Sequence, residues 1–192
     1  MNIERVLTFS KTLLEKVTED GDFAVDATAG NGHDTLFLAN LVGEKGHIYS
    51  FDIQQSAIDE TYNRLNQAKK IENVTLVHDG HHHFHQHLPL ELKGQLSSAI
   101  FNLGYLPGGD KKIVTTPDTT IEAVKGLLQW LKKGGIIVLV VYHGHEEGAV
   151  ERDALMQYVA TLDQKNARVL KYEFLNQKNN PPFIIAIEKS TP

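Results

Sequence analysis

The sequence predicts an α/β fold in which helices cover both faces of a mainly parallel sheet. Short apolar runs with strand character alternate along the chain with longer segments whose apolar residues recur about every 3.6 positions. This alternation is typical of parallel strands joined by crossover helices. The last two strand-like runs have no helical pattern between them, so we expect that pair to be antiparallel. At 192 residues, the chain is long enough for one such domain, expected over residues 1–192, and too short for two.

Each expected element follows from its own pattern. The expected helices have apolar residues three and four positions apart, and lysine pairs close two of them where cations suit the helix dipole. These helices are 2–17, 33–41, 56–70, 117–132 and 147–163. The expected strands are short apolar or β-branched runs. They are 23–26, 47–52, 74–78, 97–102, 136–142, 168–174 and 183–188.

Composition narrows the cellular setting and the class of partner. The chain has no cysteine, hence no disulfide framework, and its first residues lack a signal-peptide pattern, so a cytoplasmic location is expected. No apolar run approaches the ~20 residues of a membrane span. A net charge of −5 argues against a broad RNA-binding surface, which needs clustered Lys and Arg. Local basic pairs remain, of which Lys111-Lys112 is the best candidate for a phosphate contact.

The segment Asp26-Ala-Thr-Ala-Gly30-Asn-Gly32 is the most informative motif. It follows a buried strand and precedes a helix, so its glycines let a ligand approach the backbone beside free helix N–H groups. A dinucleotide site would need a third glycine, and Asp34 in the first helical turn would repel a pyrophosphate. A zwitterionic amino-acid ligand tolerates Asp34 better, so the motif predicts a nucleotide-type site of another kind.

Acidic residues also end the next two strands. Asp52 is placed to accept hydrogen bonds from ribose hydroxyls, which NAD and S-adenosylmethionine share, and Asp79 from an adenine amino group. Three such acids, with a D-x-x-x-G-x-G turn after the first strand, resemble the class I S-adenosylmethionine-dependent methyltransferases. The resemblance implies a Rossmann-like seven-stranded sheet ending in an antiparallel hairpin, and S-adenosylmethionine as cofactor. The cofactor residues expected are Asp26, Thr28, Gly30, Asn31, Gly32, His33, Asp34, Asp52, Ile53, Gln54, Asp79, Gly80, His81 and Asn102.

The segment after the fourth strand is expected to face the transferred methyl group, because ligands lie beyond the carboxyl ends of parallel strands. Amino-group methyltransferases carry N-P-P-Y here, and this chain keeps Asn102 and Tyr105 but has Leu103-Gly104 between them. The resemblance implies that the Asn102 amide holds the target nitrogen and the Tyr105 ring packs on the base. The alternative is that Asn102 caps a turn and Tyr105 fills the core. The substrate residues expected are Leu103, Gly104, Tyr105, Pro107, Gly108, Lys111, Tyr142, His143 and His145.

Histidines offer two further candidates. His143 and His145 follow the fifth strand, where they can transfer protons or bind a nucleotide, and we expect Asn102, Tyr105 and His145 to serve catalysis. Residues 78–87 contain six histidines, which raises the question of a metal. Adjacent histidines point in different directions, so we expect no metal, with His81 covering the adenine and the others facing solvent.

The segments DATAGNGHDT, FNLGYLPGGDK, VYHGHEEG and NQKNNPPF together resemble a family of small bacterial methyltransferases, long described as rRNA methylases and linked to the tRNA wobble position. The resemblance implies methylation of the 5-aminomethyl group of 5-aminomethyl-2-thiouridine, with the tRNA anticodon stem-loop as partner. The absence of cysteine agrees, since methylation of pyrimidine C5 usually needs a thiolate. Three alternatives stay open: an rRNA base, a small-molecule amine, or a non-catalytic adenosyl-ligand or RNA-binding module. The sequence also leaves open whether the protein forms a homodimer.

Overall fold

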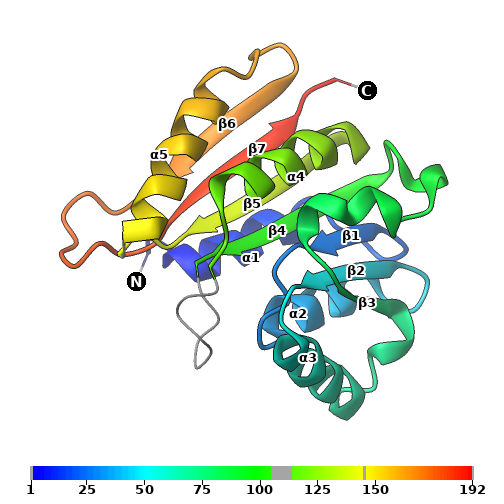
Figure 1. The fold of residues 1–192 in the computed structure, drawn as a ribbon. Helices are drawn as coiled ribbons and strands as arrows, with labels where there is room; N and C mark the ends of the chain where they lie inside the picture. Colours follow the sequence, from blue (N-terminus) through cyan, green and yellow to red (C-terminus); the bar gives the residue numbers. More distant parts are fainter. Residues whose placement is uncertain (1, 105–113, 145, 192) are drawn as a thin grey trace.

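The computed structural model describes residues 2–104, 114–144 and 146–191, and its strands form one seven-stranded sheet (Figure 1). The strands are β1 (Phe23–Asp26), β2 (His47–Asp52), β3 (Val74–His78), β4 (Leu96–Leu103), β5 (Leu131–Val141), β6 (Ala167–Tyr172) and β7 (Phe183–Lys189). Their order is β3-β2-β1-β4-β5-β7-β6. The first five strands pair in parallel, whereas β7 is antiparallel to both β5 and β6. The mainly parallel sheet with an antiparallel terminal hairpin is therefore confirmed.

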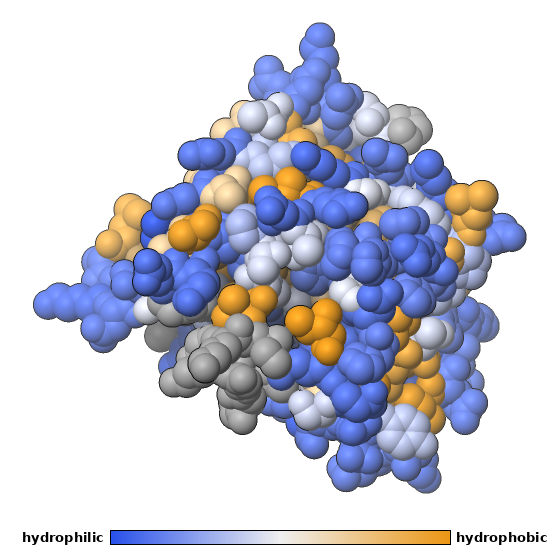
Figure 2. All heavy atoms as spheres, in the orientation of Figure 1, coloured by the Kyte–Doolittle hydropathy of each residue, from blue (hydrophilic) through white to orange (hydrophobic). Residues whose placement is uncertain are grey.

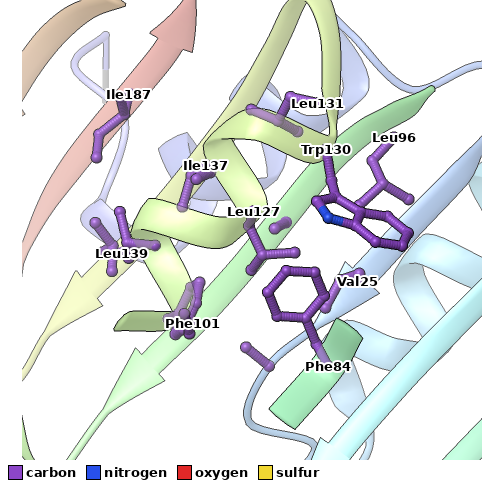
Figure 3. Packing of buried hydrophobic residues seen from close by; sticks show 14 of the residues in the cluster. Val25, Phe84, Leu96, Phe101, Leu127, Trp130, Leu131, Ile137, Leu139 and Ile187 are labelled. Carbon is purple, nitrogen blue, oxygen red and sulfur yellow. The ribbon is translucent and has the colours of Figure 1, made fainter. Parts of the chain in front are cut away.

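Helices cover both faces of the sheet, as predicted. They are α1 (Val6–Glu15), α2 (His33–Val42), α3 (Gln55–Gln67), α4 (Pro117–Trp130) and α5 (Glu146–Ala160), with short 3-10 helices η1 (Ile71–Asn73), η2 (His81–Gln86) and η3 (Leu90–Leu92). Apolar residues of α1, α2 and α3 form a buried cluster on one face, and those of α4, α5, η2 and η3 form another. In the second cluster the Phe84 and Trp130 rings meet edge to face, with centroids 5.5 Å apart (Figure 3).

Several predicted boundaries were wrong. The first helix begins at Val6 rather than residue 2, because Glu4 is held by tertiary contacts: its backbone oxygen accepts from Tyr172 and its carboxylate from Thr12. Residues 81–86, for which no helix was predicted, form a 3-10 helix, since Phe84 is buried against α4. Strand β5 begins directly after α4, at Leu131, because Leu131 already pairs with Leu96 of β4. The helices α3 and α5 each end three residues earlier than expected.

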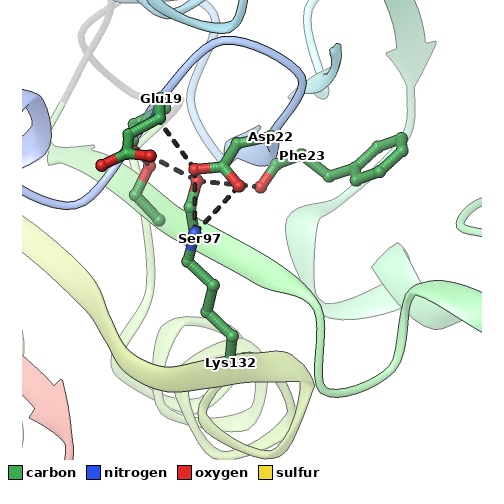
Figure 4. Close-up of polar contacts among 7 residues, drawn as sticks. Glu19, Asp22, Phe23, Ser97 and Lys132 are labelled. Atoms are coloured by element: carbon green, nitrogen blue, oxygen red, sulfur yellow. Dashed lines mark hydrogen bonds and ion pairs between the residues drawn. The ribbon is translucent and has the colours of Figure 1, made fainter. Parts of the chain in front are cut away.

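The amino-terminal edge of the sheet is held by a polar network (Figure 4). Asp22 pairs with Lys132 through both carboxylate oxygens, at 2.8 and 2.9 Å, and also accepts the Glu19 backbone N–H. The Ser97 hydroxyl donates to the backbone oxygen of Phe23 at 3.1 Å. These contacts tie the starts of β1, β4 and β5 together. They leave the opposite, carboxyl-terminal edge available for a site.

The surface in Figure 2 is mostly hydrophilic, with small separate hydrophobic patches. None of the helices formed by residues 2–104, 114–144 and 146–191 is both long and apolar enough to cross a membrane.

Candidate functional site

Two cavities meet at the carboxyl-terminal edge of the sheet. The smaller has a volume of about 250 Å³ and the larger about 830 Å³. Both are lined by the same four residues, which therefore mark the junction between them: Thr28, Gly30, Asn102 and Gly104. Two ligands bound in these cavities would face each other across this junction. The arrangement suits transfer of a group between a molecule in one cavity and a molecule in the other.

The turn after β1 is built on a buried carboxylate. Asp26 is fully buried and accepts hydrogen bonds from the Thr28 backbone N–H at 3.1 Å and the Thr35 hydroxyl at 2.6 Å. Burial, followed by the charge of Asp34, raises the pKa of Asp26 to about 7. Gly32 takes a φ of +76°, and a Cβ there would lie 2.9 Å from the backbone of Thr61 on α3. The sequence thus needs glycine at this position for both conformation and space.

Asp52 joins the turn to the end of β2. Its carboxylate accepts the backbone N–H groups of Gly30 and Gln54, both at 2.9 Å, and lies on the wall of the smaller cavity. A carboxylate can accept about four hydrogen bonds, so capacity remains on both oxygens. The sequence predicted that Asp52 binds the hydroxyl groups of a ribose, and its free acceptor positions are compatible with that prediction.

Asp79 is more heavily engaged than the sequence suggested. It accepts from the Gly80 backbone N–H at 2.7 Å and from His83 and His87 at 2.9 Å each. These hydrogen bonds, that from His83 foremost, hold the pKa of Asp79 below its usual range. The sequence predicted that the remaining histidines face solvent; His83 and His87 are exposed in part and also bind Asp79. Asp79 still lines the smaller cavity, with about one acceptor position left.

His81 offers a hydrogen-bond acceptor that has no partner among the described residues. Its Nδ1 lies 3.0 Å from the backbone oxygen of Ala27 and must donate there, because a carbonyl only accepts. Burial lowers the pKa of His81 to about 4, so the ring is neutral and Nε2 carries a lone pair at pH 7. This Nε2 is buried and has no hydrogen-bond partner among the described residues. Since His81 lines the smaller cavity, a ligand N–H such as an adenine amino group would satisfy it.

Asn102 lies at the junction and is held from two sides. Its backbone N–H donates to the Thr28 hydroxyl at 2.7 Å, and its side-chain Nδ2 donates to Asp34 Oδ2 at 2.7 Å. Asp34 lines the larger cavity together with Asn31 and His33, whereas most other predicted cofactor residues line the smaller one. Asp26 and Gly32 are not among the residues that line either cavity, and they support the turn instead.

Residues after β5 complete the larger cavity. Tyr142 and His143 line it together with Leu103 at the end of β4, and all three are among the residues predicted to bind substrate. His143 Nε2 donates to the Pro181 backbone oxygen at 3.0 Å, and Arg152 lies 3.4 Å from Nδ1. Both ring nitrogens are thus engaged, which favours a positioning role over proton transfer. Burial and the charge of Asp34 raise the pKa of Tyr142.

Some predicted residues cannot be placed, and others were missed. Tyr105, Pro107, Gly108, Lys111 and His145 lie outside the described residues. No pattern in the sequence indicated that α1 would line the larger cavity through Leu7, Ser10 and Lys11. Asn180 lines the same cavity and has a positive φ of 48°. The Asn-Asn-Pro-Pro motif around it is typical of a turn, and this motif is the sequence signal that could have indicated it. Within the described parts of the chain, no group of three His, Asp or Glu side chains could hold a metal ion.

Comparison with known proteins assigns the chain to a family. Residues 48–188 match the family described as "Putative rRNA methylase". The chain belongs to this family. A member structure from Clostridium thermocellum, described as a putative rRNA-methylase, is 40% identical and has a TM-score of 0.94, with 98% of this chain and 100% of that chain covered. A putative methyltransferase from Streptococcus mutans in complex with SAH is 39% identical, with a TM-score of 0.88 over 97% of this chain and 99% of that one.

A third relative carries a more specific name. The chloroplastic tRNA (mnm(5)s(2)U34)-methyltransferase of Arabidopsis thaliana is 37% identical over 183 residues, which is 91% of this chain. The chain spans 66% of the length of that relative. Together with the strand order, the structural likenesses confirm the Rossmann-like class I methyltransferase fold that the sequence predicted.

Proposed function

We propose that the protein is an S-adenosylmethionine-dependent N-methyltransferase that converts 5-aminomethyl-(2-thio)uridine to its 5-methylaminomethyl form at the wobble position of tRNA. The observation that carries this proposal is the position of Asn102, an amide at the junction of two cavities. The likeness to the chloroplastic tRNA methyltransferase supports the choice of substrate. We further infer one methyltransferase domain over residues 1–192 that acts in the cytoplasm.

The smaller cavity fits the adenosyl part of the cofactor. Asp52 would hold the ribose hydroxyls, and the unsatisfied His81 Nε2 would accept from the adenine amino group beside Asp79 and Gly80. The turn from Asp26 to Gly32 would surround the amino-acid end. When bound, S-adenosylmethionine supplies a methyl group made electrophilic by a sulfonium. The S. mutans relative in complex with SAH, the demethylated form of that cofactor, supports this assignment.

The residues of the larger cavity have to hold a neutral amine. An alkyl amine resembles lysine, with a pKa of about 10 in water, so it arrives mostly protonated. Removal from water favours the neutral form, and Asn102 can accept a hydrogen bond from one of its N–H groups. Alignment of the reacting atoms alone can contribute ~7 kcal/mol or more to lowering the barrier. The protein therefore needs no strong catalytic base for this reaction.

RNA is the partner class that the family description supports, and we propose the anticodon stem-loop as the part that binds. Unstacked loop bases can pack on aromatic side chains, and Tyr142 offers a 37% exposed ring on the cavity wall. Lys11 of α1 lies on the same wall, where it would provide one phosphate contact. Because the net charge is −5, we expect salt to weaken RNA binding only moderately.

An rRNA base is the second candidate, favoured by the description of the family and of its C. thermocellum member. The deciding assay gives the purified protein S-adenosylmethionine and three RNAs: tRNA with the aminomethyl group, the same tRNA without it, and rRNA. We expect mass spectrometry of the nucleosides to show one added methyl group only in the first. Asn102→Ala should lower this rate strongly while calorimetry shows nearly unchanged cofactor affinity. Equal incorporation into both tRNAs, or incorporation into rRNA alone, would contradict the proposal.

A further inference from the structure

We propose that Asp34 is a positioning residue of this site: its carboxylate fixes the Asn102 amide so that Oδ1 faces the substrate amine. The inference rests on the proposed function and goes beyond it. The sequence predicted Asp34 among the cofactor residues. In the structure Asp34 lines the larger cavity and its carboxylate is in direct contact with Asn102.

The orientation of the amide follows from hydrogen-bond chemistry. A carboxylate only accepts, so the Asn102 atom 2.7 Å from Asp34 Oδ2 must be the NH2 nitrogen. The backbone of the same residue is fixed by the Thr28 hydroxyl, 2.7 Å away. With the nitrogen turned to Asp34, Oδ1 is the atom left to accept a hydrogen bond from a ligand. The site is thus built to bind an N–H donor.

Without Asp34, the two ends of the amide would be similar in shape and free to exchange places. In the reversed orientation the NH2 group would face the amine, where it would compete for the nitrogen lone pair needed for attack. The Asp34 carboxylate has its own support, because it lies in the first turn of α2, where the helix dipole favours a negative charge. Asp34 therefore selects the productive orientation.

The charge of Asp34 also acts on the reaction. The substrate ammonium first loses a proton to solvent. The neutral nitrogen then forms a bond to the methyl carbon as the carbon–sulfur bond breaks, with its electron pair going to sulfur. Positive charge thus moves from sulfur to nitrogen, in the cavity that Asp34 lines beside Asn102. The same charge raises the pKa of the bound amine, which gives a measurable signature.

Other charged or titratable groups lie near Asp34 and Asn102 in the larger cavity. The test has to leave these residues unsubstituted. They are Lys11 of α1, His33 of α2, Tyr142 and His143 after β5, and the buried Asp26 below. None of them contacts the Asn102 side chain in a described hydrogen bond, whereas Asp34 does. Substitution of Asp34 therefore removes this contact, and by removing the charge it also lowers the pKa of Asp26 and of Tyr142.

The experiment compares Asp34→Ala, Asp34→Asn and a control, Asp59→Asn, which removes one charge from the exposed face of α3. With aminomethyl-bearing tRNA, we expect Asp34→Ala to lower kcat by about tenfold to a hundredfold through misplacement of the amine. Asp34→Asn keeps the shape and should lower kcat less. Its kcat profile should move to lower pH by about one unit, because the bound amine loses a neighbouring negative charge. Asp59→Asn should match the wild type.

Two readouts do not depend on turnover. Calorimetry should find S-adenosylhomocysteine affinity within about twofold of wild type in both Asp34 variants, a range that corresponds to ~0.4 kcal/mol. Nuclear magnetic resonance of the Asn102 side-chain NH2, assigned through Asn102→Ala, should show a shifted, slowly exchanging signal. That signature should disappear in Asp34→Ala and persist in Asp59→Asn.

The outcomes separate the inference from the proposed function. If the wild type methylates the amine and the Asp34 variants keep its kcat and pH profile, Asp34 has no positioning role. A large loss of S-adenosylhomocysteine affinity at unchanged kcat would make Asp34 a cofactor ligand instead, which also overturns the inference. If the wild type leaves the aminomethyl group unmethylated, the proposed function fails, and the NH2 signal still decides whether Asp34 orients Asn102.

Discussion

Asp26 is a buried acid whose pKa lies far above its ordinary value. It is fully buried, and burial, with the charges of Asp34 and Asp52, raises its pKa from 3.8 to about 7 against the lowering effect of two hydrogen bonds. Between about pH 4 and pH 7 the folded protein therefore holds a proton that the unfolded chain has released. The stability that comes from the protonated form is complete below pH 4 and is lost as the pH rises toward 7.

Asp26→Asn tests this directly, because an amide imitates the protonated acid. Its oxygen can accept the Thr28 N–H, and its nitrogen can donate to the Thr35 hydroxyl, which in turn contacts Ser50. We expect the variant without cofactor to gain stability over the wild type, by on the order of a few kcal/mol, as the pH rises from about 4 to 8. Thermal unfolding at several pH values measures the difference. A difference that stays constant with pH would show that Asp26 is ionised throughout.

Elements whose signals are local were predicted well from the sequence. The first three strands and the acid that follows or ends each one agree with the structure, because buried strand, turn and polar end lie within a few consecutive residues. Elements that depend on distant partners were predicted poorly. The start of α1 is set by Tyr172, and η2 forms because Phe84 packs on Trp130 of α4. For the same reason the contributions of Lys11 and Asn180 to the larger cavity were missed.

The turn between β1 and α2 gives a test at the level of one element. Gly32→Ala should destabilise the protein by about 1–3 kcal/mol from backbone strain alone, and by more because the new Cβ meets Thr61. Gly134→Ala is the matched control, since Gly134 has a φ of +77° but open space around it. Thermal unfolding and calorimetry with S-adenosylhomocysteine compare them. Equal stability losses in the two variants would show that the contact with Thr61 does not matter.

Across the whole molecule, the amino-terminal and carboxyl-terminal ends of the strands differ in role. The amino-terminal edge is cross-linked by Asp22, Lys132 and the contact of Ser97 with Phe23, whereas the carboxyl-terminal edge opens into two cavities. Stability and binding are therefore expected to respond to substitutions at opposite ends of the same strands. This division lets one property be changed while the other is held fixed.

Lys132→Met makes that division measurable. It leaves the Asp22 carboxylate, whose side chain is 19% exposed, without its cation, at a cost of about 1–3 kcal/mol. For a chain of this size we expect a fall in Tm of roughly 3–10 °C. Cofactor affinity should remain unchanged. Adding Asp22→Asn should cost less than the sum of the two single changes, because the partners share one interaction. An unchanged Tm would mean that the ion pair contributes nothing, and weakened cofactor binding would mean that the edges are coupled.

The wall of the larger cavity has a consequence for how the protein is made. It combines Leu7, Ser10 and Lys11 near the beginning of the chain with Asn180, just before the last strand. A ribosome delivers these segments at opposite ends of synthesis. The described residues that line the smaller cavity, by contrast, are all present once Thr119 has emerged. A nascent chain thus possesses these residues well before the larger cavity can close, and only a nearly finished chain can have both.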